Sequence, residues 1–170
     1  MDGAELLNDP EMKEVVDDFC KESEDLFEQL EDVLEDLEDD PSDSAKLEQF
    51  GQTIDRVMGA AKSIGLEEIA TFSELGKTIG YKSSQVEDMP LREVVIAILF
   101  DALDLLKKMV AALKKGNIEG MKDLNTKAFA TRMKWLSDKF KNVERGSCEY
   151  DSEEKQSQDE IDNLMESLGL

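Results

Sequence analysis

The stretch Lys46 to Gly65, KLEQFGQTIDRVMGAAKSIG, determines how the chain folds. Its apolar residues recur at spacings of three and four, which places them on one side of a helix: Leu47, Phe50, Ile54, Val57, Ala61 and Ile64. We expect this side to lie in a hydrophobic core. The opposite side carries Glu48, Gln52, Asp55 and Gly59, a combination that core packing does not require. This second side is therefore a candidate functional surface.

The remainder of the chain has the composition of a helical protein. Aromatic residues make up only 6% of the sequence, which favours helices over sheets. Periodic apolar residues predict further helices over 10–40, 66–79, 90–115 and 119–143, with a loop at 80–89. Four long helices joined by short turns favour an all-α antiparallel four-helix bundle, with the segment 66–79 as an additional short helix. We expect residues 1–143 to form this bundle.

The charge of the chain excludes several classes of partner. The sequence has 41 Asp and Glu against 20 Lys and Arg, a net charge of −21, whereas nucleic acids and anionic membranes attract clustered basic residues. The longest apolar run, Val94 to Phe100, is much shorter than a membrane span. The first residues lack a signal-peptide core, so we expect a cytoplasmic protein. With no histidine and two cysteines, we expect no metal site.

The composition changes after residue 143. Residues 144–156 are rich in charge and lack apolar periodicity, which predicts a flexible linker. In the tail 157–170, SQDEIDNLMESLGL, apolar residues follow helical spacing, with Ser157 as the expected N-cap and Glu160 at the capping-box position. A helix this short is marginal alone in water. We expect it to fold on contact with a partner or, alternatively, on its own bundle.

Residues 54–70, IDRVMGAAKSIGLEEIA, resemble histidine-phosphotransfer (Hpt) domains such as the first domain of the chemotaxis kinase CheA. In those domains a phosphorylatable histidine precedes a glycine-centred patch, where a response-regulator receiver approaches, and a turn containing Glu-Glu. Gly59 and residues 65–68 match this pattern, but Asp55 stands at the histidine position. The resemblance implies an Hpt-like fold over about residues 10–143 and a receiver as partner. A chain without histidine does not relay phosphate through phosphohistidine.

The tail is similar to the C-terminal peptide by which the phosphatase CheZ binds the response regulator CheY. A segment of the flagellar switch protein FliM carries a related Ser-Gln-x-Glu-Ile-Asp pattern. This resemblance implies that the tail contacts a CheY-type receiver through Ser157, Gln158, Asp159, Glu160, Ile161, Asp162, Leu164, Met165 and Leu168. Residues 48–56, EQFGQTIDR, also resemble the CheZ active-site stretch, in which an acid is followed four residues later by Gln with Gly just before it. The acid is Glu48 here, where CheZ has Asp.

These resemblances imply hydrolysis of a receiver's aspartyl phosphate. Gln52 is the candidate for orienting the attacking water, because an amide both donates and accepts hydrogen bonds. Glu48 is expected to pair with the receiver's active-site lysine. The receiver supplies its own Mg²⁺, so we expect no cofactor or metal bound by this chain itself. The remaining residues expected to contact the receiver are Gly51, Asp55, Arg56, Gly59 and Lys62.

The resulting hypothesis is a CheZ-like phosphatase, a hydrolase of the two-component signalling that controls chemotaxis and flagellar motility. One alternative is a non-catalytic adaptor that binds or localises CheY on an Hpt-like bundle. Another is a structural component of the flagellar motor or of the chemoreceptor array. The effect of Gln52→Ala on dephosphorylation distinguishes the phosphatase from the adaptor. A homodimer through an exposed apolar face is compatible with each of these functions.

Overall fold

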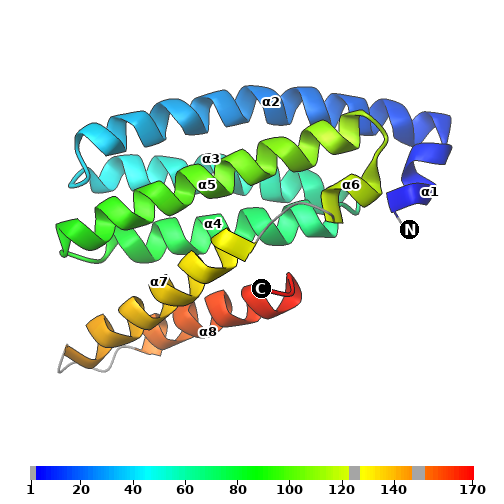
Figure 1. Ribbon diagram of the computed structural model, residues 1–170. Helices are drawn as coiled ribbons and strands as arrows, with labels where there is room; N and C mark the ends of the chain where they lie inside the picture. Colours follow the sequence, from blue (N-terminus) through cyan, green and yellow to red (C-terminus); the bar gives the residue numbers. More distant parts are fainter. Residues whose placement is uncertain (1–2, 123–126, 147–151) are drawn as a thin grey trace.

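The computed structural model describes residues 3–122, 127–146 and 152–170, and every element in these ranges is an α-helix (Figure 1). Four helices form the antiparallel bundle: α2 (Pro10–Asp39), α3 (Ser44–Ser63), α4 (Glu67–Ser84) and α5 (Met89–Lys114). Each of the four packs against two of the others, in the order α2, α3, α4, α5 and back to α2. The all-α bundle predicted from the sequence is confirmed. None of the described helices is both long and apolar enough to cross a membrane.

Aspartates begin three of the bundle helices. Asp9, Asp43 and Asp88 accept hydrogen bonds from backbone N–H groups in the first turns of α2, α3 and α5, at 3.0 to 3.1 Å. These N–H groups have no partner within the helix, so a side-chain acceptor stabilises the helix start. Pro10 and Pro90 lie in the first turn of α2 and α5, where a proline loses no helical hydrogen bond.

The helix predicted over 66–79 is longer than expected, because α4 continues through Gly80 to Ser84. Two glycines shape the contact of this helix with α3, and the second of them, Gly80, lies in the extension. A Cβ atom at Gly76 would lie 2.9 Å from Cδ1 of Ile54, and one at Gly80 would lie 3.3 Å from Cδ1 of Phe50. The glycines therefore let α4 pack closely on α3, and this contact outweighs their helix propensity, which is about 1 kcal/mol lower than that of alanine. The loop predicted at 80–89 is confined to residues 85–88.

The fourth long helix of the bundle is α4, and not the helix predicted over 119–143. In that region the structure describes α6 (Ile118–Lys122) and α7 (Lys127–Gly146), and residues 123–126 lie outside the described part. α7 packs on the outside of α5 (Figure 1). The prediction was wrong because helical periodicity identifies an apolar face without identifying the helix that covers it. A short helix that was not predicted, α1 (Gly3–Asn8), precedes α2.

The tail forms a helix on the surface of its own bundle. α8 (Ser152–Ser167) packs against α4 and α7 (Figure 1). Because α8 begins at Ser152, Ser157 is not its N-cap, and both ends of the segment expected to be a linker are helical. Residues 147–151 of that segment lie outside the described residues. The division of the chain into bundle, linker and tail stays a prediction.

A buried arginine joins two loops at one end of the bundle. Arg92 on α5 is 4% exposed. Its guanidinium donates to four backbone carbonyls, those of Pro41 and Ser42 at 3.2 Å, Ser84 at 2.9 Å and Val86 at 2.6 Å. The first two carbonyls lie between α2 and α3, and the other two lie at the end of α4 and just beyond it. Arg92 thereby fixes the start of α3 relative to the end of α4.

Candidate functional site on α3

The candidate site occupies the outward face of α3. We call the residues Glu48, Gln52, Asp55, Gly59 and Lys62, which follow one another at spacings of three and four, the α3 stripe. The opposite face of the same helix buries Leu47, Phe50, Ile54, Val57 and Ala61 in the core. The amphipathic reading of this stretch is therefore correct, and the stripe lies where a second protein has access to it.

Glu48 and Gln52 are the two residues predicted to carry the chemistry. They lie one helical turn apart, and both side chains are exposed. Within the part of the chain that the structure describes, neither side chain forms a hydrogen bond or an ion pair. Their polar groups therefore face solvent and are available to a ligand or a partner.

Two glycines lie on the surface of α3, Gly51 beside Gln52 and Gly59 about two turns further along. A Cβ atom added at Gly51 or Gly59 would meet no atom within 4 Å. Packing inside the chain therefore does not explain either glycine, in contrast to the glycines of α4 described above. Each glycine lowers helix stability by about 1 kcal/mol relative to alanine. Both leave the helix backbone open to close approach from outside.

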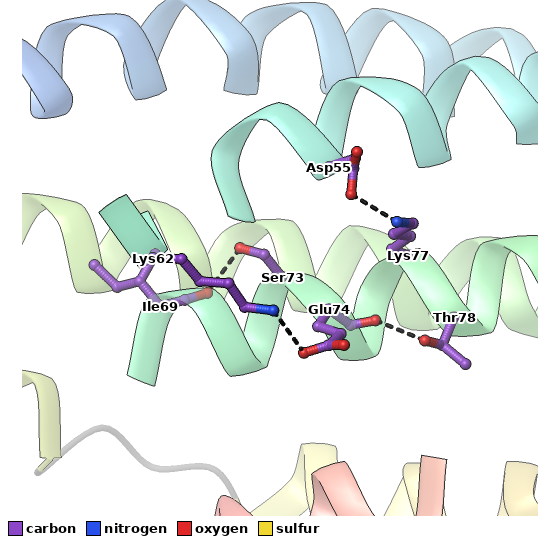
Figure 2. A network of polar contacts seen from close by, with 7 residues as sticks. All are labelled: Asp55, Lys62, Ile69, Ser73, Glu74, Lys77 and Thr78. Carbon is purple, nitrogen blue, oxygen red and sulfur yellow. Dashed lines mark hydrogen bonds and ion pairs between the residues drawn. The ribbon is translucent and has the colours of Figure 1, made fainter. Parts of the chain in front are cut away.

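Charged side chains of α4 hold the C-terminal half of the stripe. Figure 2 shows the carboxylate of Asp55 facing Lys77, whose Nζ lies 2.6 Å from Oδ1. Nζ of Lys62 lies 3.5 Å from Oε2 of Glu74 in the same view. These four side chains are partly exposed, so the pairs orient the side chains more than they stabilise the fold.

Lys77 and Glu74 were not identified from the sequence. A signal for them exists, since they lie three residues apart on α4 and are opposite in charge to their partners on α3. The hydroxyls near them are satisfied within α4, where Ser73 donates to the carbonyl of Ile69 at 2.8 Å and Thr78 to that of Glu74 at 2.9 Å (Figure 2). The two ion pairs thus link α3 to α4 in this region.

Arg56, which was also predicted to contact a receiver, lies beside the stripe on the side of α2. Its guanidinium is 3.7 Å from Oε1 of Glu22, and both side chains are well exposed. An ion pair of this length between exposed groups is weak. Arg56 is therefore free to exchange Glu22 for an acidic partner at little cost.

The structure does not bring the tail to the stripe. α8 packs against α4 and α7, whereas the stripe lies on α3. In the tail, Ile161 and Met165 are buried, Leu164, Leu168 and Asp162 are half-buried, and Asp159 and Glu160 are exposed. The side chains of Ser157 and Gln158 lie outside the described residues. A receiver bound to the tail would therefore have to reach the stripe by movement of the tail.

Metal ligands do not gather at this site. Across the described ranges, no group of three or more Asp, Glu or Cys side chains is arranged to hold a metal ion, and the sequence has no histidine. The polar groups of the stripe are one carboxylate and one amide in solvent, followed by two ion pairs. This arrangement suits contact with a partner that brings its own reactive centre.

The fold and the stripe define a four-helix bundle that offers one exposed helix face to another domain. The sequence model of the Hpt domain family matches residues 14–116, which span the four bundle helices, and the chain belongs to this family. A search of curated proteins and a search of solved structures found no match. Hpt domains interact with the receiver domains of response regulators, so a response regulator is the kind of partner that the family indicates. The chain is thereby a phosphotransfer-related protein of two-component signalling.

Proposed function

We propose that this chain is a phosphatase that acts on a phosphorylated CheY-type response regulator in bacterial chemotaxis. The observation that supports this most directly is the pair Glu48 and Gln52, exposed one turn apart and without partners in the described chain. Gly51 beside them and Gly59 further along leave the helix surface open. The chain belongs to the Hpt family but has no histidine, and the resemblance puts Asp55 at the histidine position. If this face is functional, its function is therefore other than phosphohistidine transfer.

The reaction needs one positioned water. Its oxygen attacks the phosphorus of the receiver's acyl phosphate, the bond from phosphorus to the aspartyl oxygen breaks, and the carboxylate leaves. The proton of the water passes to solvent or to the released phosphate. The amide of Gln52 can accept a hydrogen bond from this water and donate one to the phosphoryl group. Holding the water in line supplies much of the catalysis in such transfers, because little covalent chemistry is left for the protein.

Glu48 serves to hold the receiver. Its carboxylate, one turn before Gln52, is placed to pair with the lysine of a receiver active site. The receiver itself carries Mg²⁺ beside its phospho-aspartate, so the chain needs to supply only the positioning groups.

The tail brings the receiver to the bundle. Its residues 157–170 are similar to the CheY-binding peptide of CheZ, and they are joined to α7 by a short connection. A receiver held on such a tether is present near the bundle at an effective concentration of about millimolar. A weak contact at the stripe is then sufficient for turnover.

The test is the decay of phosphorylated CheY with and without this protein. We expect acceleration of the decay by the wild type and loss of most of this acceleration in Gln52→Ala. When the chain is truncated before Ser157, we expect a higher protein concentration to be needed for the same acceleration. Gln29→Ala, an exposed glutamine on α2, is the matched control and is expected to behave as the wild type. Equal acceleration by Gln52→Ala and the wild type would refute the catalytic role.

A non-catalytic adaptor is the second candidate. It is favoured by Asp55, which stands at the histidine position and is neutralised by Lys77 rather than left free for chemistry. An adaptor would bind CheY through the tail and leave the rate of dephosphorylation unchanged. Binding that depends on the tail, without acceleration by any variant, would establish this function.

A further inference from the structure

The side of α8 that faces the bundle is its apolar side. Ile161 is 1% exposed and Met165 is 6% exposed, and Leu164 and Leu168 are packed at the edge of the same core. These four residues make up the apolar face of the tail. Asp159 and Glu160, which are exposed, lie on its outer side. The apolar face is therefore covered by α4 and α7 in this structure.

A specific polar contact accompanies this packing. The hydroxyl of Ser137 on α7 donates to Oδ1 of Asp162 at 2.9 Å. Nζ of Lys141, one turn further along α7, lies 3.5 Å from Oδ2 of the same carboxylate. A charged acceptor bound by two donors fixes the register of α8 against α7.

The C-terminal turn of α8 also contributes to the contact with the bundle. Gly169 has a φ of +71°, a left-handed conformation that glycine adopts readily. The N–H of Leu170 donates to the carbonyl of Met165 at 2.9 Å, and that of Gly169 to Glu166 at 3.0 Å, which is the Schellman pattern. The turn directs Leu170 to a cavity of about 200 Å³ that it lines together with Leu168, Phe72, Met109 and Met121. The contact thus extends to the last residue of the described chain.

We propose that the surface formed by α4 and α7 is a binding surface for the chain's own α8, and that it competes with the receiver for the apolar face of the tail. This inference rests on the proposed function, because it assumes that the tail binds a receiver. One apolar face cannot be buried on two surfaces at once. Receiver capture therefore requires α8 to leave the bundle.

The competition sets the affinity of the whole protein. The apparent dissociation constant equals the intrinsic one divided by the fraction of molecules whose tail is free. A tail that is docked in nine molecules of ten weakens receiver binding about tenfold. Any change that loosens α8 without altering its sequence is then expected to tighten receiver binding.

The first experiment loosens α8 from the α7 side. In the full chain, Ser137→Ala combined with Lys141→Glu removes the two contacts to Asp162 described above and leaves the tail sequence intact. Lys134→Glu makes the same charge change at an exposed position of α7 and is the matched control. Two quantities are measured: hydrogen exchange of the α8 amides in the chain alone, and affinity for a CheY-type receiver loaded with Mg²⁺ and beryllofluoride. We expect faster exchange and about three- to tenfold tighter binding in the double variant only.

The second experiment fixes α8 in place. Ser137→Cys with Asp162→Cys, in a Cys148→Ser chain, puts two thiols at positions whose side chains are already in contact. Because Asp162 is itself expected to contact the receiver, the two redox forms of this one variant are compared with each other, and the oxidised form is expected to bind the receiver about tenfold more weakly than the reduced form.

The outcomes separate this inference from the function on which it rests. Faster exchange in α8 with unchanged receiver affinity, or full binding by the oxidised variant, would refute the competition while the tail remained a receiver ligand. No receiver binding by any variant, whether α8 is docked or released, would refute the proposed function of the tail and the competition together.

Discussion

The carboxylate of Asp55 on α3 lies 2.6 Å from the ammonium group of Lys77 on α4. Asp55 follows Gln52 by three residues on the same exposed face. A free carboxylate at this distance would repel an approaching phosphoryl group. Lys77 compensates that charge from the neighbouring helix.

Removal of Lys77 is therefore expected to slow the proposed dephosphorylation of the receiver while leaving the fold almost unchanged. The side chains of both partners are more than 40% exposed, so the pair contributes at most about 1 kcal/mol to stability. In Lys77→Met, the acceleration of CheY dephosphorylation should fall about three- to tenfold, roughly 1 kcal/mol of barrier. Combining it with Asp55→Asn should restore the rate, because the repelling charge is then absent. An equally slow double variant would contradict the electrostatic role.

The glycines of α3 and α4 are expected to respond oppositely to a methyl group. Gly59→Ala adds a Cβ in open space and should stabilise the fold by about 1 kcal/mol, through helix propensity. Gly76→Ala places its Cβ 2.9 Å from Cδ1 of the buried Ile54, and overpacking of this kind typically destabilises by about 1 to 3 kcal/mol. Urea unfolding of the two variants measures the difference.

For the contact with the receiver, we expect the opposite ranking of the two variants: Gly59→Ala should weaken it more than Gly76→Ala. The methyl group of Gly59→Ala lies on the surface where the receiver is expected to approach and should weaken the contact, whereas Gly76→Ala lies inside the bundle. Gly59→Ala protein that is more stable but binds the receiver as well as the wild type would show that this glycine does not serve close approach.

The one cysteine with a described side chain is expected to be unreactive. Burial raises the pKa of the Cys20 thiol from 9.0 to about 11, with smaller contributions in the same direction from Asp17 and Glu24, against an opposing one from Lys114. The unfolded chain loses this proton at lower pH than the folded chain, so the contribution to stability is complete below pH 9.0 and declines as the pH rises to about 11.

Three measurements on a Cys148→Ser chain check this. The Cβ chemical shift of Cys20 should titrate near pH 11, and alkylation at pH 8 should be slow until the chain is unfolded by urea. The stability advantage of this chain over the same chain with Cys20→Ala should shrink between pH 9 and 11. Rapid alkylation of the folded protein would mean that the thiol is accessible.

The long helices α2, α3 and α5 could be predicted from the sequence, but the way the helices pair could not. The bounds of α2, α3 and α5 follow from apolar periodicity and from the Asp and Pro residues at their starts. The position of α4 depends on Gly76 and Gly80 fitting against Ile54 and Phe50, a contact between residues far apart in the chain. Local patterns carry no information about that fit, so α4 was predicted too short and the helix after α5 was predicted inside the bundle.

In the candidate site, too, some residues could be predicted from the sequence and others could not. The exposure of Glu48 and Gln52 follows from their angle on the helix and was predicted. Lys77 was not, because the register of α4 against α3 decides which of its charges meets Asp55. For the tail, the spacing from Ile161 to Leu168 predicts an apolar face that needs a cover, and leaves open whether a receiver or the bundle provides it.

Arg92 is expected to be the most important charged residue for stability. Four carbonyls from two loops accept its hydrogen bonds, and the hydroxyl of Ser44 accepts two more, at 3.2 and 3.3 Å. Arg92→Met fills a similar volume but leaves these acceptors without a donor, and a hydrogen bond to a charged group is worth about 1.5 to 3 kcal/mol. We expect a loss of about 2 to 4 kcal/mol, since the loops can relax toward water.

The control for Arg92→Met is Arg132→Met, which removes a guanidinium paired with Asp101 at an exposed position between α7 and α5. This variant should lose no more than about 1 kcal/mol. Urea titration gives both values, and an unchanged m-value would show that the compactness of the two end states is preserved. Because Arg92 ties the start of α3 to the end of α4, its loss should also disorder the first turns of α3 and lower the proposed phosphatase activity even where the bundle remains folded. Equal stability losses in the two variants would show that the buried contacts of Arg92 add nothing beyond an exposed ion pair.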